Sequence, residues 1–198
     1  AITYGEISAH RHFPGTVGIS VDTLSSMIED IVRGFISQGF KNILIINGHY
    51  GNVAPITVAL RRVGIDFPNI GLYAVGGFSL GSAVIQKIRK SQVIAHACEL
   101  ETALSLVIQP ENVQLDAAVK ELPGVPLSNK WWSLDTYGPK KLIHLPRRFP
   151  KMGEDAGVWG DPTVATKEFG EKAIAAMIDD LVELLLEIVK SESEVRGY

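Results

Sequence analysis

The chain has a single cysteine, Cys98, among its 198 residues. One thiol cannot form an internal disulfide framework, so a small disulfide-stapled fold is excluded and a reducing, cytoplasmic compartment is expected. No apolar run approaches the roughly 18 residues that a membrane-spanning helix needs, and no signal peptide is visible. An excess of one charge is also lacking, because 19 basic and 22 acidic residues give a net charge of −3. Neither nucleic acid nor a membrane surface is therefore an expected partner.

Hydrophobic residues make up 46% of the chain and charged residues 21%, which suits one globular domain with a sizeable core. Apolar periodicity predicts strands at 42–46, 70–75 and 141–145, and helices at 22–38, 52–63, 83–90, 98–108 and 163–189. This alternation predicts an α/β fold with helices on both faces of a parallel sheet. Asp22 is the expected N-cap of the first helix, and Gly39 is its expected C′ residue.

The segment "IINGHYGN" presents a histidine directly after a strand. The apolar run 43–46 is expected to be covered on both faces, as in a parallel sheet. In open α/β sheets, ligands bind at the carboxyl ends of the strands, where His49 would lie. Gly48 and Gly51 permit close approach of other groups. His49 is therefore a candidate metal ligand or acid–base group; the alternative is a histidine that only bonds a neighbouring carbonyl.

The segment "HACELETALS" places His96 just before a helix and two carboxylates in its first turn. Glu99 and Glu101 both gain from the helix N-terminal dipole. Glu101 shares a mainly apolar stripe with Leu104, Ser105 and Ile108. Because an ionised carboxylate facing a core is costly, a metal ion or a buried salt bridge is expected beside Glu101. The simpler alternative for Glu99 is a solvated acid that stabilises the helix end.

The loop at residues 5–16 carries Ser8, His10 and His12 and turns at Pro14-Gly15. It could line the same crevice as His49, or it could be an ordinary surface loop. Its residues alone do not distinguish these alternatives.

Four motifs in order, "HRHFPGTVGIS", "NGHYGN", "HACELETALS" and "GVWGDPTVATKEFGEKAI", resemble the creatininase (creatinine amidohydrolase) family. The resemblance covers about residues 3 to 180. It implies a layered α/β sandwich around a mainly parallel sheet. It also implies two divalent metal ions, zinc, manganese or iron, that hydrolyse a C–N bond of a small cyclic or linear amide. A homo-oligomer, a hexamer in many members, is the expected assembly.

The resemblance also assigns roles. His49 and Glu101 match metal ligands of the family. His96 matches a histidine near the scissile amide and is the expected proton donor to the leaving nitrogen. Three residues fall beside the substrate: Ser8, His12 and Tyr50.

The sequence departs from the family at two places. An upstream Glu-x-His pair and an Asp, three of the family's five ligands, have no counterpart, and creatininase itself has an acidic or amide residue where this chain has Gly51. We therefore expect a single creatininase-like domain over residues 1–198 that is the C-terminal part of a longer protein. The alternatives are deformylation or peptide cleavage at the same site, or a non-catalytic subunit or binding module.

Overall fold

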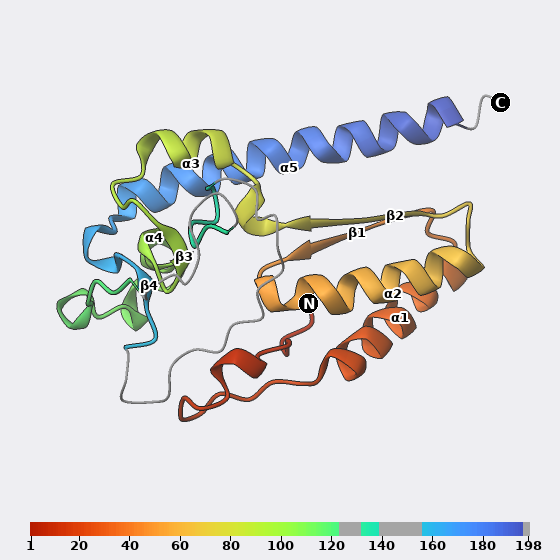
Figure 1. Ribbon diagram of the computed structural model, residues 1–198. Helices are drawn as coiled ribbons and strands as arrows, with labels where there is room; N and C mark the ends of the chain where they lie inside the picture. The colour runs from red at the N-terminus through yellow and green to blue at the C-terminus, as the bar shows by residue number, and fades with distance from the viewer. Residues whose placement is uncertain (123–131, 139–155, 196–198) are drawn as a thin grey trace. The chain divides into compact units, whose positions relative to one another are not determined.

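The computed structural model describes residues 1–122, 132–138 and 156–195 (Figure 1). The strand expected at 141–145 lies outside these ranges. The chain forms two compact units, one of residues 1–80 with those from 183 onward, the other of residues 81–182. Each unit is described by itself, and the expectation of a single domain stays a prediction.

The first unit contains a parallel strand pair with two helices, and also the C-terminal part of the last helix from residue 183 onward. After a 3-10 turn at Ser8–His10, its elements are α1 (Val21–Ser37), β1 (Asn42–Asn47), α2 (Val53–Asp66) and β2 (Gly71–Gly76), with 3-10 turns at Tyr50–Asn52 and Gly77–Ser79. β1 and β2 pair in parallel from Asn42–Gly71 to Asn47–Gly76. α1 and α2 lie side by side on one face of this pair (Figure 1). Their shared core consists of Leu24, Ile28, Val32, Ile56, Ala59 and Val63.

The predicted helices and strands of this unit are confirmed, but the cap of α1 is not. Ser20 is extended, and its Oγ accepts the Thr23 N–H at 3.2 Å, so Ser20 is the N-cap. Asp22 is already inside the first turn of α1, where its negative charge interacts favourably with the helix dipole. Gly39, with φ +92°, is the expected left-handed residue after the helix.

The expectation that β1 is covered on both faces is wrong for this unit. Ile43 and Ile45 pack against the helix core, whereas the next side chain, Ile46, is 53% exposed. Alternate residues of a strand point to opposite faces. The helices α1 and α2 therefore bury one face of β1 and leave Ile46 largely open.

The second unit contains α3 (Ser82–Ile88), β3 (Ile94–His96), α4 (Glu99–Ile108), β4 (Trp159–Gly160) and the first part of α5 (Lys167–Val195). β3 pairs antiparallel with β4, with Ile94 opposite Gly160 and His96 opposite Trp159. Short 3-10 turns occupy Pro110–Asn112, Leu115–Ala117 and Pro162–Val164. The long helix was expected to begin at residue 163. Because the last of these turns occupies Pro162–Val164, the helix begins at Lys167 instead.

Helices α4 and α5 approach each other closely at Gly170. A Cβ on this buried glycine would overlap the carbonyl oxygen of Ala103 and stand 2.7 Å from its carbonyl carbon. Close to this contact in the sequence, both helices carry fully buried residues: Leu100 and Ala103 on α4, and Ala173 on α5. None of the helices in the described ranges is long and apolar enough to cross a membrane.

Candidate functional site

His49 lies directly after the carboxyl end of β1, as the sequence predicts. Its N–H bonds the Asn47 side-chain oxygen at 3.1 Å, which fixes the turn out of the strand. The surroundings of position 51 explain why a glycine follows His49 so closely. A Cβ there would stand 2.7 Å from both the Glu6 carbonyl oxygen and His49 Nε2, and 3.0 Å from Glu6 Oε2. The absence of a side chain at Gly51 therefore lets the imidazole and the Glu6 segment meet.

Burial lowers the pKa of His49 below its ordinary value of 6.5. The nearby charge of Glu6 and a hydrogen bond to the Glu6 backbone act in the opposite direction but do not overcome burial. The imidazole is thus favoured in its neutral form, which is the form that binds a metal. The simpler alternative, a bond from His49 to a neighbouring backbone group, is also present, so the two interpretations coexist.

The loop at residues 5–16 is tied to the same strand end. Glu6 forms a β-bridge with Ile19, its N–H bonds Asn52 Oδ1 at 2.9 Å, and its carboxylate accepts the Ser8 N–H at 2.9 Å. The buried His10 ring lies 6.1 Å from the His49 ring, edge to face. This part of the loop therefore lies beside His49, and whether it lines a crevice there stays a prediction.

The three residues expected beside a substrate differ in their surroundings. Ser8 is exposed, and Tyr50 is 72% exposed. His12 stacks on Phe13, with ring centroids 4.3 Å apart. Its buried Nε2 has no hydrogen-bond partner among the described residues. A role for these residues in binding a substrate stays a prediction.

Two residues at this strand end were not singled out from the sequence as site residues. Glu6 stands in no recognisable motif, and Asn52 is only the last residue of "NGHYGN". The contact between Glu6 and Asn52 spans 46 positions, and no local pattern predicts it.

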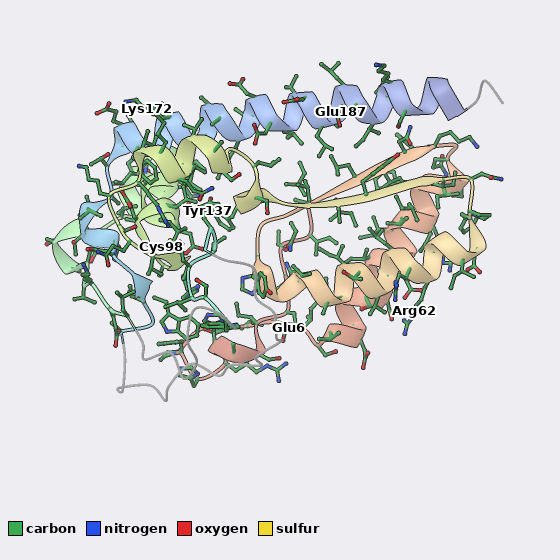
Figure 2. The ribbon with its side chains drawn as sticks, turned by 45° about the horizontal axis from the view of Figure 1, so that its top comes forward. Glu6, Arg62, Cys98, Tyr137, Lys172 and Glu187 are labelled. Atoms are coloured by element: carbon green, nitrogen blue, oxygen red, sulfur yellow. The ribbon has the colours of Figure 1, made fainter. Side chains whose placement is uncertain are left out.

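In the second unit, His96 ends β3, and a sharp turn leads to α4. Ala97 makes this turn with φ +47°, a left-handed conformation unusual for a residue with a Cβ. Cys98 follows and is fully buried in the same unit as Tyr137 (Figure 2). Burial raises the pKa of the Cys98 thiol to about 11 and also raises the pKa of Tyr137. Without a metal ion, Cys98 is therefore protonated at neutral pH.

Glu101 stands in the first turn of α4, half-buried, with its Oε2 3.9 Å from Cys98 Sγ. Burial raises the pKa of this carboxyl, and the backbone N–H groups of Cys98 and Ala97 partly oppose the rise. Within the described ranges Glu101 forms no ion pair.

The face assigned to Glu101 from the sequence is corrected by the structure. Ser105 and Ile108 on its stripe are exposed, so this stripe does not face a core. The buried face of α4 carries Glu99, Leu100 and Ala103 instead. Glu99, for which a solvated acid was one of the alternatives, is 1% exposed, so that alternative is wrong. Its carboxylate accepts hydrogen bonds from Lys90 and Ser91.

The candidate residues thus form two half-sites. His49 lies in the first unit with Ser8, His12 and Tyr50, while His96 and Glu101 lie in the second. That the two half-sites converge on one crevice stays a prediction. Across the part of the chain that the structure describes, three or more His, Cys, Asp or Glu side chains never gather closely enough to hold a metal.

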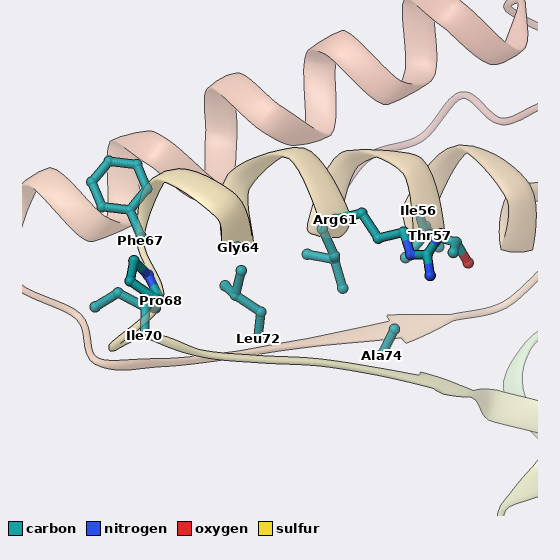
Figure 3. A pocket seen from close by; sticks show the side chains of 10 residues that line it. Ile56, Thr57, Arg61, Gly64, Phe67, Pro68, Ile70, Leu72 and Ala74 are labelled. Atoms are coloured by element: carbon teal, nitrogen blue, oxygen red, sulfur yellow. The ribbon is translucent and has the colours of Figure 1, made fainter.

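A separate groove lies between α2 and β2 in the first unit (Figure 3). Its volume is about 430 Å³, and it is lined mostly by apolar residues, among them Ile56, Leu60, Phe67 and Leu72. No candidate site residue borders it.

Comparison with known proteins agrees with the motifs. A model of the creatininase family, described as creatinine amidohydrolase, matches residues 1–185. The chain therefore belongs to the creatininase family, whose α/β fold the solved structures below share.

Relatives with described activities are hydrolases. Creatinine amidohydrolase from Pseudomonas putida is 27% identical over 189 residues, which cover 89% of this chain and 67% of that protein. A mycofactocin precursor peptide peptidase from Mycobacterium tuberculosis is 28% identical over 192 residues, covering 92% of this chain and 62% of the peptidase. The chain thus spans about two-thirds of the length of these relatives.

The solved structures confirm the fold. A creatinine amidohydrolase-like protein from Bacteroides fragilis superposes with a TM-score of 0.74 at 26% identity, over 91% of this chain and 67% of that one. A crystal structure of creatininase superposes with a TM-score of 0.69 at 22% identity, over 92% and 71% of the two chains. The predicted fold class is therefore correct, although the described strands include one parallel and one antiparallel pair.

Proposed function

We propose that the protein to which this chain belongs hydrolyses a C–N bond of a small cyclic amide or formamide with the help of divalent metal ions. In this proposal His49 and Glu101 are metal ligands and His96 is the proton donor. Membership of a family whose named relatives include an amidohydrolase, a peptidase and a 3-dehydro-scyllo-inosose hydrolase supports hydrolysis as the reaction class.

The observation that carries the proposal is the setting of His49. A neutral imidazole stands at the end of a parallel strand, and the space that it occupies depends on the bare Cα of Gly51. Ligands of open α/β sheets are bound at such strand ends.

The donor chemistry of the two half-sites fits a divalent metal. An imidazole and a carboxylate, with the nearby thiol protonated, suit zinc, manganese or iron. Each half-site supplies fewer than three such donors, so further ligands are needed for a complete site. Solved creatininases are described as a Zn–Zn type and a manganese form, but at 22% identity they establish the fold alone.

When bound, the metal ions would supply Lewis acid chemistry at the amide carbonyl and an activated water. The residues of this chain would supply the proton transfer and the contacts to the substrate. His96 would pass a proton to the nitrogen as the C–N bond breaks. Ser8, Tyr50 and His12 would bind the substrate.

The test compares His49→Ala with His96→Ala in the complete protein. The first should lose bound metal, because a ligand is removed. The second should keep its metal but turn over about 10²- to 10⁴-fold more slowly, the usual effect of losing a general acid. Metal analysis beside hydrolysis of a panel of cyclic amides and formamides measures both. A His96→Ala variant as poor in metal as His49→Ala would show that His96 is a ligand instead.

A peptide amide is the second candidate substrate, and it is favoured by the peptidase relatives at 28% identity. Short peptides belong in the same panel. Absence of both metal and turnover would instead favour a non-catalytic binding module.

We also propose that the protein forms a homo-oligomer. Exposed apolar side chains recur on one helix, α5: Ile178, Val182, Leu185, Leu186 and Val189. Such a stripe is typical of a surface that is covered in an assembly. Sedimentation as a monomer at micromolar concentration would contradict this proposal.

A further inference from the structure

Glu99 is the most deeply buried acid among the described residues of α4, at 1% exposure. Its carboxylate is saturated by short hydrogen bonds. The Lys90 N–H lies 3.0 and 3.1 Å from its two oxygens. The Ser91 N–H and hydroxyl both donate to Oε2, at 2.7 and 2.6 Å. These bonds satisfy the oxygens of a side chain that is almost fully removed from solvent.

These bonds close a loop around His96. The chain leaves Ser91, forms β3, turns at Ala97 and returns through Cys98 to Glu99, only eight positions later. His96 stands just before the turn. Ala97 holds a left-handed conformation that its Cβ disfavours. Strained backbone of this kind persists where the surroundings hold it in place. The Glu99 carboxylate is the group that ties the two ends of this loop together.

A second acid, half-buried, bonds the start of the same strand. Asp135 Oδ1 accepts the Ile94 N–H at 3.0 Å and lies 2.8 Å from Arg89 Nη1. The neighbouring Thr136 N–H donates to the Ile94 carbonyl at 2.7 Å. The start of β3 and the residues before it are therefore fixed at both ends by carboxylates.

We infer that Glu99 is a positioning residue for the proposed reaction: its carboxylate clamps the Lys90–Ser91 backbone and so fixes His96 relative to the first turn of α4, where Glu101 stands. The inference rests on the proposed function, because it assigns His96 the proton transfer. Glu99 itself is too deeply buried to touch a substrate. Its effect on the reaction would pass through the backbone of the loop.

Glu99→Gln in the complete protein tests the inference. The substitution keeps the shape, but its NH₂ group meets N–H and O–H donors that need an acceptor. We expect kcat to fall about 10- to 100-fold, because small misplacement of a catalytic group has effects of this order. KM should change less than about twofold and the metal content should be unchanged. The Lys90 and Ser91 amides should exchange hydrogen at least about tenfold faster.

A double-mutant cycle separates positioning from general destabilisation. In a His96→Ala background, Glu99→Gln should cause little further loss of kcat, because the group that it positions is gone. Ser91→Ala removes one donor only, so it should show a smaller loss of the same kind if Glu99→Gln folds poorly. Asp180→Asn is the control. It weakens a carboxylate–backbone bond to Gly81, away from the loop, and should leave kcat unchanged.

Two failures can be told apart. A wild-type protein without amide turnover, or an active His96→Ala variant, would overturn the proposed function and with it the role of Glu99 in that reaction. An active wild type whose Glu99→Gln variant has the same kcat, or loses the same factor with and without His96, would overturn the inference alone. Unchanged hydrogen exchange at Lys90 and Ser91 would also overturn it.

Discussion

Gly170→Ala should destabilise the chain, although the same change in most helices does the opposite. Gly→Ala inside a helix usually stabilises by roughly 0.5–1 kcal/mol. At Gly170 the new Cβ would overlap the Ala103 carbonyl and stand 2.8 Å from Val107 Cγ2. The nearest atoms are backbone and cannot rotate away, so α4 and α5 must separate. Overpacking of this kind typically costs about 1–3 kcal/mol, which leaves a net loss of about 1 kcal/mol at the middle of these ranges and about 2.5 kcal/mol at most after the helix gain.

Gly34→Ala in α1 is the matched control. Gly34 is exposed, and a Cβ there meets nothing within 4 Å, so this variant should gain the usual roughly 0.5–1 kcal/mol. Urea denaturation followed by circular dichroism measures both. At a slope of roughly 2 kcal/mol/M, Gly170→Ala should lower the midpoint by about 0.5–1 M. A Gly170→Ala variant as stable as the wild type would refute the close packing of α4 on α5.

Three further outcomes are expected. Cys98 should react slowly with thiol reagents, since a pKa of about 11 against 9.0 leaves about 100-fold less thiolate at neutral pH; reaction as fast as in the urea-unfolded chain would contradict its burial. In the metal-free protein, an NMR titration should give His49 a pKa below 6.5. Because the folded state then binds fewer protons than the unfolded state, the free energy of unfolding should decrease as pH falls from 6.5 toward that lower value, and a smaller decrease is expected in His49→Ala. Ser20→Ala should lower the free energy of unfolding by about 1 kcal/mol in urea denaturation through loss of the α1 cap, whereas Asp22→Ala should matter less.

Most elements could be predicted because their signals are local. The apolar periodicity of α1, the strand run before Asn47 and the glycine after α1 each occur within a few residues, and the structure has all three. The cap of α1 was misassigned by two positions because Ser20 and Asp22 are both good capping residues. Only the backbone conformation at Ser20 decides between them.

The burial of α4 could not be predicted, because both of its faces carry apolar residues. Periodicity favoured the stripe of Glu101, but the contact with Gly170 of α5 buries the opposite one. The same limit applies to Glu99. Its partners Lys90 and Ser91 lie in a loop with no recognisable pattern, so nothing local marks it as a buried, fully bonded carboxylate. Likewise, Glu6 meets His49 only through a contact between distant segments.

The close approach at Gly51 also constrains how this sequence can change during evolution. Two atoms stand 2.7 Å from a Cβ there, His49 Nε2 and the Glu6 backbone oxygen, and no substitution at Glu6 removes the second. Gly5 is similarly restricted, since its Cβ would stand 2.9 Å from Asn52 Oδ1. A new residue at position 51 therefore becomes tolerable only after the segment around Glu6 has shifted. Substitutions here should be epistatic, with the order in which they arise deciding which of them survive.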